Sequence, residues 1–276
     1  MTKRWLFLGT GAGILLLGIG IMALKRSTVP VAKTAPDSSS RDGSAARVLF
    51  AQAERARIQG ALPEAKLSYQ QILTSAPTSD VAPTAQQRLG EVNLKLILSP
   101  TLTPDSVAYS IQPGDTLTKI AKQFHTTVEL LKISNGLTND RIRPDQRLKV
   151  PKTVFSVIVD KSQNSLTLKN KEEILKVYRC ATGAEGITPV GSFKITSRIV
   201  DPPWFSPEGL IPPGDPRNAL GSRWLGFDQP GYGIHGTTDP SSIGKPVTRG
   251  CVRLLNSDVE ELFTLLPEGT PVTIVD

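Results

Sequence analysis

The sequence predicts a multidomain protein that combines an N-terminal transmembrane helix, a helical segment, a small α+β module and a mostly β C-terminal domain. Three observations predict this organisation. Residues 5–24 carry no charge, residues 44–100 place apolar side chains at helical spacing, and short alternating segments separated by Gly and Pro fill residues 153–276. A chain of 276 residues has room for two or three small domains beside a membrane segment.

The uncharged stretch 5–24 predicts a membrane anchor. As a helix its 20 residues span about 30 Å, the thickness of the apolar core of a bilayer. Cleaved signal peptides have a shorter apolar core followed by small residues at the cleavage site, and residues 21–26 fit that pattern poorly. We therefore expect residues 1–26 to form an uncleaved signal anchor, with cleavage as the alternative. Basic residues flank both ends and do not orient the helix.

Residues 27–43 are rich in Ser, Pro and Ala and predict a linker, and residues 44–100 predict three helices. The first helix ends at Gly60, the second starts near Pro63 and stops before Pro77, and the third covers about 83–98. The pair around Gly60 resembles one tetratricopeptide repeat, which cannot bury its faces alone. Two interpretations stay open: a spacer packed on a neighbouring domain, or a binding site for a protein partner.

Residues 106–152 predict a strand, two helices and a closing strand. Thr116 caps the first helix, and Asn135 with Gly136 ends the second. The stretches 113–117, Pro-Gly-Asp-Thr-Leu, and 133–137, Ile-Ser-Asn-Gly-Leu, closely resemble LysM modules.

The LysM resemblance implies binding to polymers that contain N-acetylglucosamine. The groove would involve Gly114, Asp115 and Thr116 together with the loop near 139–142. Turn formation alone is the alternative role for these residues. His125 is expected at the surface, at the end of a helix, and not as a ligand.

Residues 153–276 predict a mostly β domain. Alternating strands are expected at 155–159, 165–169 and 174–180, with a closing strand at 271–275. One helix is expected from residue 256 or 257 to 266, capped by the Ser257 side chain.

Cys251 and His235 are the candidates for chemistry, because acyl transfer needs a nucleophile, a base and donors for the oxyanion. A nearby imidazole is expected to lower the pKa of the thiol. Gly250 leaves the backbone N–H groups beside Cys251 unshielded. Arg253 lies two positions beyond Cys251, on the same face of an extended segment, where it can hold a carboxylate. Taken alone, either residue is more often a buried structural side chain.

The surrounding motifs resemble the catalytic domain of the L,D-transpeptidases (YkuD-like). The signature of that family is His-Gly, followed some fifteen residues later by Ser/Thr-x-Gly-Cys-Ile/Val-Arg; this chain has His235-Gly236 and the matching hexapeptide at 248–253. Arg249 stands where many members have a second His, which leaves His235 as the base. The likeness covers 154–276 and includes pieces at 182–183, 188–193, 211–214, 218–221, 256 and 258.

This resemblance implies a β-sandwich-like domain and a two-step reaction without a metal or other cofactor. The Cys251 thiolate would attack a peptidoglycan stem tetrapeptide, D-Ala would leave with a proton from His235, and an amine of another stem would resolve the thioester to a 3→3 cross-link. Gly250, Gly236 and Arg253 would bind the oxyanion or the substrate. A backbone carbonyl of residue 236 or 237 would hold the His.

Two further points follow from the sequence. Cys180 is expected to be a buried free thiol, and two cysteines and two histidines are too few for a disulfide scaffold or a structural zinc site. The net charge of +7 is spread along the chain, which favours an anionic surrounding, whether nucleic acid, anionic lipid or an acidic polymer, without naming one. A nucleic-acid partner is not expected.

The predicted anchor, glycan-binding module and cross-linking enzyme all imply the same cellular location. They place the catalytic domain on the outer, periplasmic or cell-wall, side of the cytoplasmic membrane, with peptidoglycan stem peptides and glycan strands as partners. L,D-carboxypeptidase or cross-link hydrolase activity is the alternative within enzymes, because the acceptor decides the outcome. A non-catalytic scaffold that binds the cell wall is the alternative from another class.

Overall fold

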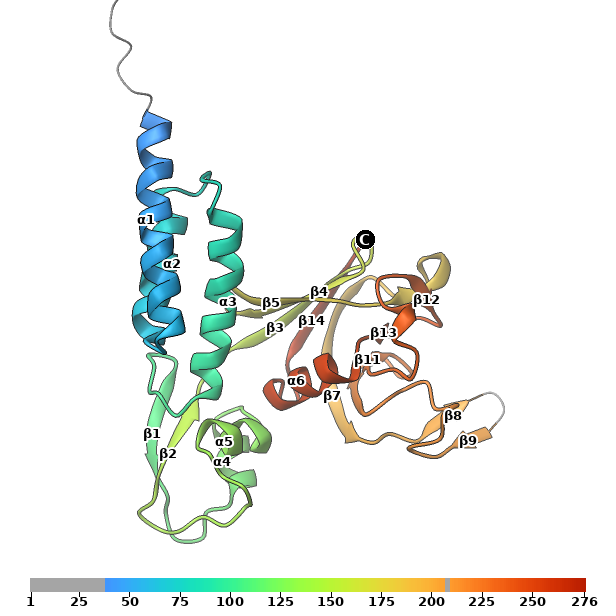
Figure 1. The fold of residues 1–276 in the computed structure, drawn as a ribbon. Coiled ribbons are helices and arrows are strands. Elements are labelled where there is room, and N and C mark those ends of the chain that lie inside the picture. Colours follow the sequence, from blue (N-terminus) through green and yellow to red (C-terminus); the bar gives the residue numbers. More distant parts are fainter. Residues whose placement is uncertain (1–37, 207–208) are drawn as a thin grey trace, which may run out of the picture. The chain divides into compact units, whose positions relative to one another are not determined.

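The computed structural model describes residues 38–206 and 209–276 (Figure 1). The predicted anchor at 5–24 and most of the predicted linker lie outside these residues. In the part that is described, no helix is long and apolar enough to cross a membrane.

Three helices open the described chain: α1 (Ser38–Ile58), α2 (Leu62–Ser75) and α3 (Ala82–Leu98). They pack around a small core centred on the fully buried Tyr69 and Ile72. The three predicted helices are present, but α1 begins at Ser38, inside the segment expected to be a linker. Apolar spacing cannot mark the end of a helix whose first turns are polar. The likeness to a tetratricopeptide repeat stays a prediction.

Helix α3 packs against β5 (Glu173–Arg179), the last strand of the C-terminal sheet. Gly90 permits this approach, because a Cβ there would lie 2.1 Å from the backbone oxygen of Leu175. This contact supports the interpretation of the helices as a spacer packed on a neighbouring domain.

The expected strand–helix–helix–strand module is present. It comprises β1 (Ser106–Ser110), α4 (Leu117–Gln123), α5 (Val128–Ser134) and β2 (Arg147–Pro151), with β1 and β2 antiparallel. The Thr116 hydroxyl accepts a hydrogen bond from Lys119 N, and the Thr127 hydroxyl caps α5 in the same way. His125 is exposed at the end of α4, as predicted.

The C-terminal domain is built on one mixed sheet of eight strands, in the order β13-β11-β10-β7-β14-β3-β4-β5. Neighbouring strands are antiparallel except for the parallel pairs β14–β3 and β11–β13. The strands predicted at 155–159, 165–169, 174–180 and 271–275 are all present. The bounds of the sheet strands not yet given are β3 (Phe155–Asp160), β4 (Ser165–Asn170), β7 (Gly191–Val200), β10 (Arg223–Phe227), β11 (Gly233–His235), β13 (Val252–Arg253) and β14 (Pro271–Val275).

Smaller elements complete the domain. Two further pairs of strands are β6 (Thr182–Gly183) with β12 (Pro246–Thr248) and β8 (Trp204–Ser206) with β9 (Gly209–Ile211). The short 3₁₀ turns are η1 (Ala184–Gly186) and η2 (Pro240–Ser242).

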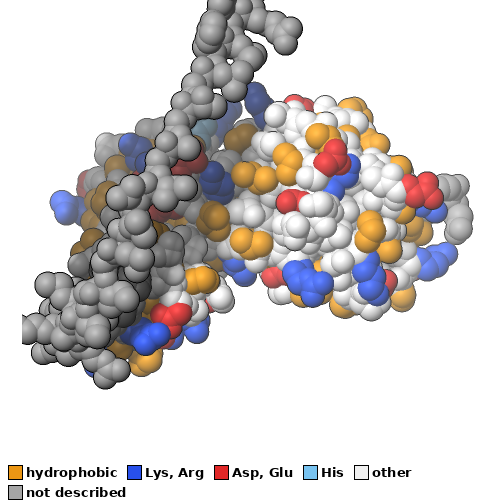
Figure 2. All heavy atoms as spheres, turned by 90° about the horizontal axis from the view of Figure 1, so that it is seen from above, with side chains coloured by type: hydrophobic (Ala, Val, Ile, Leu, Met, Phe, Trp, Pro, Cys, Tyr) orange, Lys and Arg blue, Asp and Glu red, His pale blue; other side chains and the backbone are white. Residues whose placement is uncertain are grey.

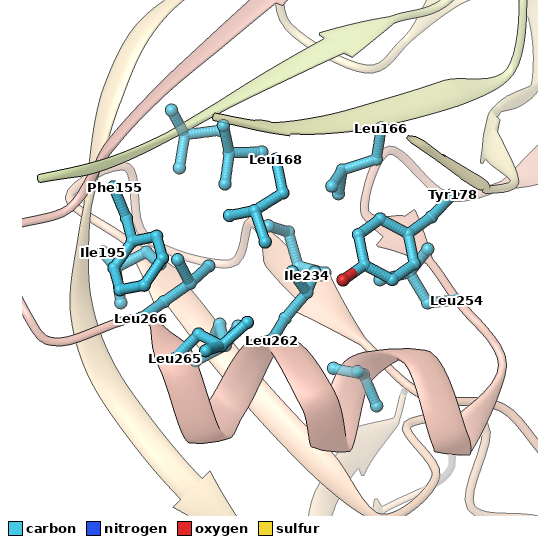
Figure 3. Close-up of a cluster of buried hydrophobic side chains, with 14 of the residues drawn as sticks. Phe155, Leu166, Leu168, Tyr178, Ile195, Ile234, Leu254, Leu262, Leu265 and Leu266 are labelled. Atoms are coloured by element: carbon cyan, nitrogen blue, oxygen red, sulfur yellow. The ribbon is translucent and has the colours of Figure 1, made fainter. Parts of the chain in front are cut away.

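One curled sheet and a helix form the main core, in place of the two facing sheets implied by a sandwich-like fold. Leu166 and Leu168 of β4 point toward Leu262 of α6 (Asn256–Leu265), and all three are fully buried (Figure 3). The apolar face of α6 thus covers the sheet and closes the core, the role that a second sheet has in a sandwich.

The start of α6 differs from the prediction. Its N-cap is Leu255, no side chain caps it, and Ser257 lies within the first turn. The Asn256 side chain is directed instead to the chain around Thr237, as described below.

The LysM-like module is docked on its neighbours. The buried Lys149 donates hydrogen bonds to the carbonyl oxygens of Leu96, Ile97 and Ser99 at the end of α3. The Arg198 guanidinium of β7 pairs with Glu129 of α5 at 3.1 Å. Apolar side chains of α3 and α5 join the main core: Leu94, Ile97 and Leu130.

Charged side chains of both signs are mixed on one face of the molecule. On the face shown in Figure 2, Lys and Arg lie scattered among acidic and hydrophobic side chains, with no single patch of one sign. On this face the described residues therefore form no basic stripe of the kind that binds nucleic acid.

Candidate active site

Three neighbouring strands, β10, β11 and β13, place their side chains on two faces with opposite character. Leu225, Ile234 and Val252 are fully buried in the main core. Ile234 pairs with Val252 and His235 pairs with Arg253 in parallel register. Because side chains alternate along a strand, His235 and Arg253 lie on the face opposite the core. Cys251 precedes Val252 and therefore belongs to the same face as His235.

His235 is held as a single neutral tautomer. Its Nδ1 atom lies 2.7 Å from the Gly236 carbonyl oxygen, and a carbonyl can only accept, so Nδ1 carries the proton. The Nε2 atom is therefore left with a lone pair and can act as a base. The expectation that a backbone carbonyl at residue 236 or 237 holds the His is met by Gly236.

Burial keeps the imidazole neutral. The residue is only 3% exposed, and this burial lowers the pKa of His235 to about 4. The hydrogen bonds of the ring to the backbone of Gly236 and of Leu220 oppose the shift, and the positive charge of Arg253 adds to it.

Cys251 sits in the loop before β13, partly exposed. Its Sγ lies 3.4 Å from the Gly231 carbonyl oxygen and accepts a hydrogen bond from the Gly233 N–H. Burial raises the pKa of the Cys251 thiol, while the Gly233 N–H and Arg253 act in the opposite direction. The resting state thus has a neutral thiol and a neutral imidazole on the same sheet face, and the expected lowering of the thiol pKa by His235 is not seen.

Gly250 determines the shape of the loop 248–251, called the nucleophile loop here because it carries Cys251. Gly250 has φ +115°, and a Cβ there would lie 2.8 Å from Cε1 of Tyr232. Only glycine combines this backbone conformation with this close approach. The Gly250 N–H donates to the Thr248 hydroxyl at 3.2 Å, and that hydroxyl donates to the Cys251 carbonyl at 2.6 Å. The Gly250 N–H is therefore engaged in the loop, and the role of Thr248 was missed from the sequence.

Arg253 is half-buried beside the thiol. Its Nη1 donates to the Ser242 hydroxyl at 3.1 Å. Its Nε is buried and has no hydrogen-bond partner among the described residues. An unpaired guanidinium N–H at the site matches the predicted role of Arg253 in holding a carboxylate.

Asn256 ties the loop after His235 to α6. Its side-chain oxygen accepts from the backbone N–H groups of Thr237 at 3.0 Å and Ser222 at 3.2 Å, and its amide donates to the Thr237 carbonyl. A Cβ on Gly236 would lie 2.1 Å from this oxygen, which explains the glycine after His235. The motif contained Asn256, but only the structure gives it this role.

The remaining predicted residues lie elsewhere. Cys180 is a buried free thiol, as expected, and burial raises its pKa to about 12. In the LysM-like module the Asp115 carboxylate accepts from the Tyr109 hydroxyl and from Gln112 N, so it builds its own loop. Gly114 has φ +86°, which a turn requires, and Thr116 caps α4. A surface hollow lies along 139–146, and these three residues are not part of its lining.

Comparison with known proteins matches two parts of the chain. Residues 155–274 match the model of the L,D-transpeptidase catalytic domain (YkuD), and residues 109–151 match the LysM domain. YkuD of Bacillus licheniformis, which is named as an L,D-transpeptidase, is 36% identical over 174 residues, covering 60% of this chain and 97% of the relative. YkuD of Bacillus subtilis is 35% identical over 175 residues, covering 61% and 98%.

Solved structures of L,D-transpeptidases also match, one of them from Mycobacterium tuberculosis H37Rv. It covers 49% of this chain and 75% of its own at 15% identity, with a TM-score of 0.40. The family assignment rests on the sequence relatives, because the match covers almost the full length of both YkuD proteins. The chain therefore belongs to the L,D-transpeptidase family and carries a LysM domain before its catalytic domain.

Proposed function

We propose that this protein is a peptidoglycan L,D-transpeptidase in which Cys251 is the nucleophile and His235 the general base and acid. One observation carries the assignment: the bond from Nδ1–H of His235 to Gly236 leaves Nε2 as the basic atom, on the sheet face that Cys251 shares. The neutral thiol and neutral imidazole are the protonation states from which a proton passes from Sγ to Nε2 as the sulfur attacks.

In the first step the sulfur forms a bond to the carbonyl carbon of the third residue of a stem tetrapeptide. The bond to the terminal D-Ala nitrogen breaks, and the imidazolium of His235 returns the proton to that nitrogen. D-Ala leaves and a thioester on Cys251 remains. In the second step an amine of another stem attacks the thioester, gives its proton to His235 and releases the thiol.

The loop around Cys251 limits the groups that can bind the oxyanion. Since the Gly250 N–H is already bonded to Thr248, we assign the oxyanion to the Cys251 N–H and not to Gly250. The unpaired Nε of Arg253 is proposed to hold a carboxylate of the substrate.

The LysM domain is proposed to hold glycan strands, and the chain is proposed to lie on the outer side of the cytoplasmic membrane, anchored by residues 5–24. Membrane fractionation of the full chain tests the anchor. Recovery of a soluble form that starts near residue 27 would refute it. Binding to sacculi stripped of stem peptides, measured at raised salt, tests the glycan site, because a purely electrostatic attraction is lost there.

Mass spectrometry of purified stem tetrapeptides incubated with the protein tests the reaction. We expect D-Ala release together with a cross-linked dimer that carries a 3→3 bond. Tripeptide without dimer would identify water as the acceptor and the protein as an L,D-carboxypeptidase. Absence of both products from a folded protein would support a non-catalytic scaffold.

A further inference from the structure

Trp224 of β10 lies directly across the strand pair from His235. The two residues are register partners in the antiparallel β10–β11 pair, and their rings stack with centroids 6.0 Å apart at an interplanar angle of 21°. Cross-strand aromatic partners of this kind restrict each other's rotamers. The indole therefore covers one side of the imidazole.

Two glycines make the space that the indole occupies. Gly226 pairs with Gly233, two positions along each strand and on the same face as the two rings. A Cβ on Gly226 would lie 2.6 Å from Nε1 of Trp224, and a Cβ on Gly233 would lie 2.9 Å from its Cζ2. Real Cβ atoms do not approach so closely, so any other residue at either position would displace the ring.

The indole contacts His235 directly and lies against Gly233, which in turn contacts Cys251. Gly233, whose missing side chain admits the ring, also presents its N–H to the Cys251 sulfur. His235 lies two residues further along β11. A ring wedged across Gly233 and His235 fixes the base and the thiolate-stabilising N–H relative to each other.

We propose that Trp224 is a positioning residue of this active site, which fixes the plane of the His235 imidazole, shields it from water and holds the Gly233 N–H at the Cys251 sulfur. This proposal rests on the proposed function for its kinetic consequences. Its structural part, the shielding of the imidazole, is independent of the reaction. The ionisable groups on the sheet face of His235 are Arg253, its register partner on β13, and Cys251, which precedes β13. Arg253 lowers the pKa of His235 in addition to burial.

The test compares Trp224→Leu, Trp224→Phe and Gly226→Ala with the wild type. Trp224→Leu should lower kcat by about ten- to a hundredfold with a smaller change in KM, because misplacement of a catalytic group acts on the transition state. Trp224→Phe keeps a flat ring and should restore most of the rate. Gly226→Ala should displace the intact indole and reproduce the defect. Phe193→Leu, which removes a stacked ring of the same sheet away from the site, should match the wild type.

The second readout is the titration of His235 by NMR of histidine-labelled protein. Only His125 and His235 give signals, and the exposed His125 serves as the internal reference. Trp224→Leu should move the His235 midpoint upward, because water reaches the ring, and the acid limb of the rate profile should move with it. An unchanged midpoint and rate in both Trp224→Leu and Gly226→Ala would overturn the proposal. A wild type that titrates as stated but releases no D-Ala would instead refute the proposed function alone.

Discussion

The Lys149 ammonium lies 2.6 Å from the Leu96 carbonyl oxygen, so a side chain of the LysM domain caps the last turn of α3. The last carbonyls of a helix have no partner within it, and a cation at that end also interacts favourably with the helix dipole. This single side chain joins the LysM domain to the helical segment.

Replacement of Lys149 by Met should lower the free energy of unfolding by about 2 kcal/mol, because buried carbonyls lose a charged donor. Burial lowers the pKa of Lys149 to about 8, below its ordinary value of 10.5. The folded state then binds fewer protons than the unfolded state between about pH 8 and 10.5, so this residue makes the free energy of unfolding rise with pH in that window. Urea unfolding of both proteins across pH 7–11 measures the difference. A constant difference at all pH values would contradict the burial of the charged amine.

The two cysteines should differ sharply in reactivity. Cys251 is partly exposed, whereas Cys180 is fully buried with its pKa raised to about 12. We expect iodoacetamide to label the native protein once, at Cys251, and the unfolded protein twice. Intact mass and peptide mapping give the count and the position.

Cys251→Ala should remove both the native label and all D-Ala release. Cys180→Ala, the matched control, should keep both. A native adduct at Cys180, or cross-linked product from Cys251→Ala, would show that the nucleophile is assigned wrongly.

The rate should depend on pH through a broad plateau. His235, with its pKa lowered by burial to about 4, stays a base down to low pH. The Cys251 thiol, with its pKa raised above the ordinary 9.0, keeps its proton well into the alkaline range. The plot of kcat/KM against pH should therefore fall only near pH 4 and above pH 9. A narrow bell centred between pH 5 and 8 would instead indicate a preformed thiolate–imidazolium pair.

Gly250→Ala should damage the nucleophile loop. A side chain at φ +115° is strained by about 1–3 kcal/mol, and its Cβ would in addition press on Tyr232. We expect a large loss of kcat together with a lowered melting temperature. Gly269→Ala is the matched control: it has φ +88° with nothing within 4 Å of a Cβ, so it should lower stability and leave kcat unchanged. Equal kcat in wild type and Gly250→Ala would show that the loop tolerates a side chain.

Local patterns predicted the parts of this fold that depend on neighbours in sequence. The alternation at 155–159 and the turn chemistry around Thr116 are local signals, and both elements formed as expected. Cys251 and His235 were predicted from their motifs, and the structure places both on one face of the sheet.

The features that were missed depend on contacts between distant residues. Trp224 gains its position only from the register of β10 against β11, and no spacing along the chain reveals that register. Asn256 was expected at the start of a helix capped by Ser257, yet its side chain bonds to residues 19 and 34 positions away. The neutral state of the thiol likewise depends on burial, which a motif does not encode.

The close approach of α3 to β5 at Gly90 affects which fragments of the enzyme can be expressed without aggregating. Strand β5 ends the eight-stranded sheet, and open strand edges are templates for pairing with other chains. A fragment that starts at residue 153 would lose this cover and present the β5 backbone at Leu175 to its own copies. Such a fragment should self-associate edge to edge during expression, whereas one that starts before α1 should stay monodisperse. In this chain we therefore expect α3 also to prevent aggregation through the edge strand β5.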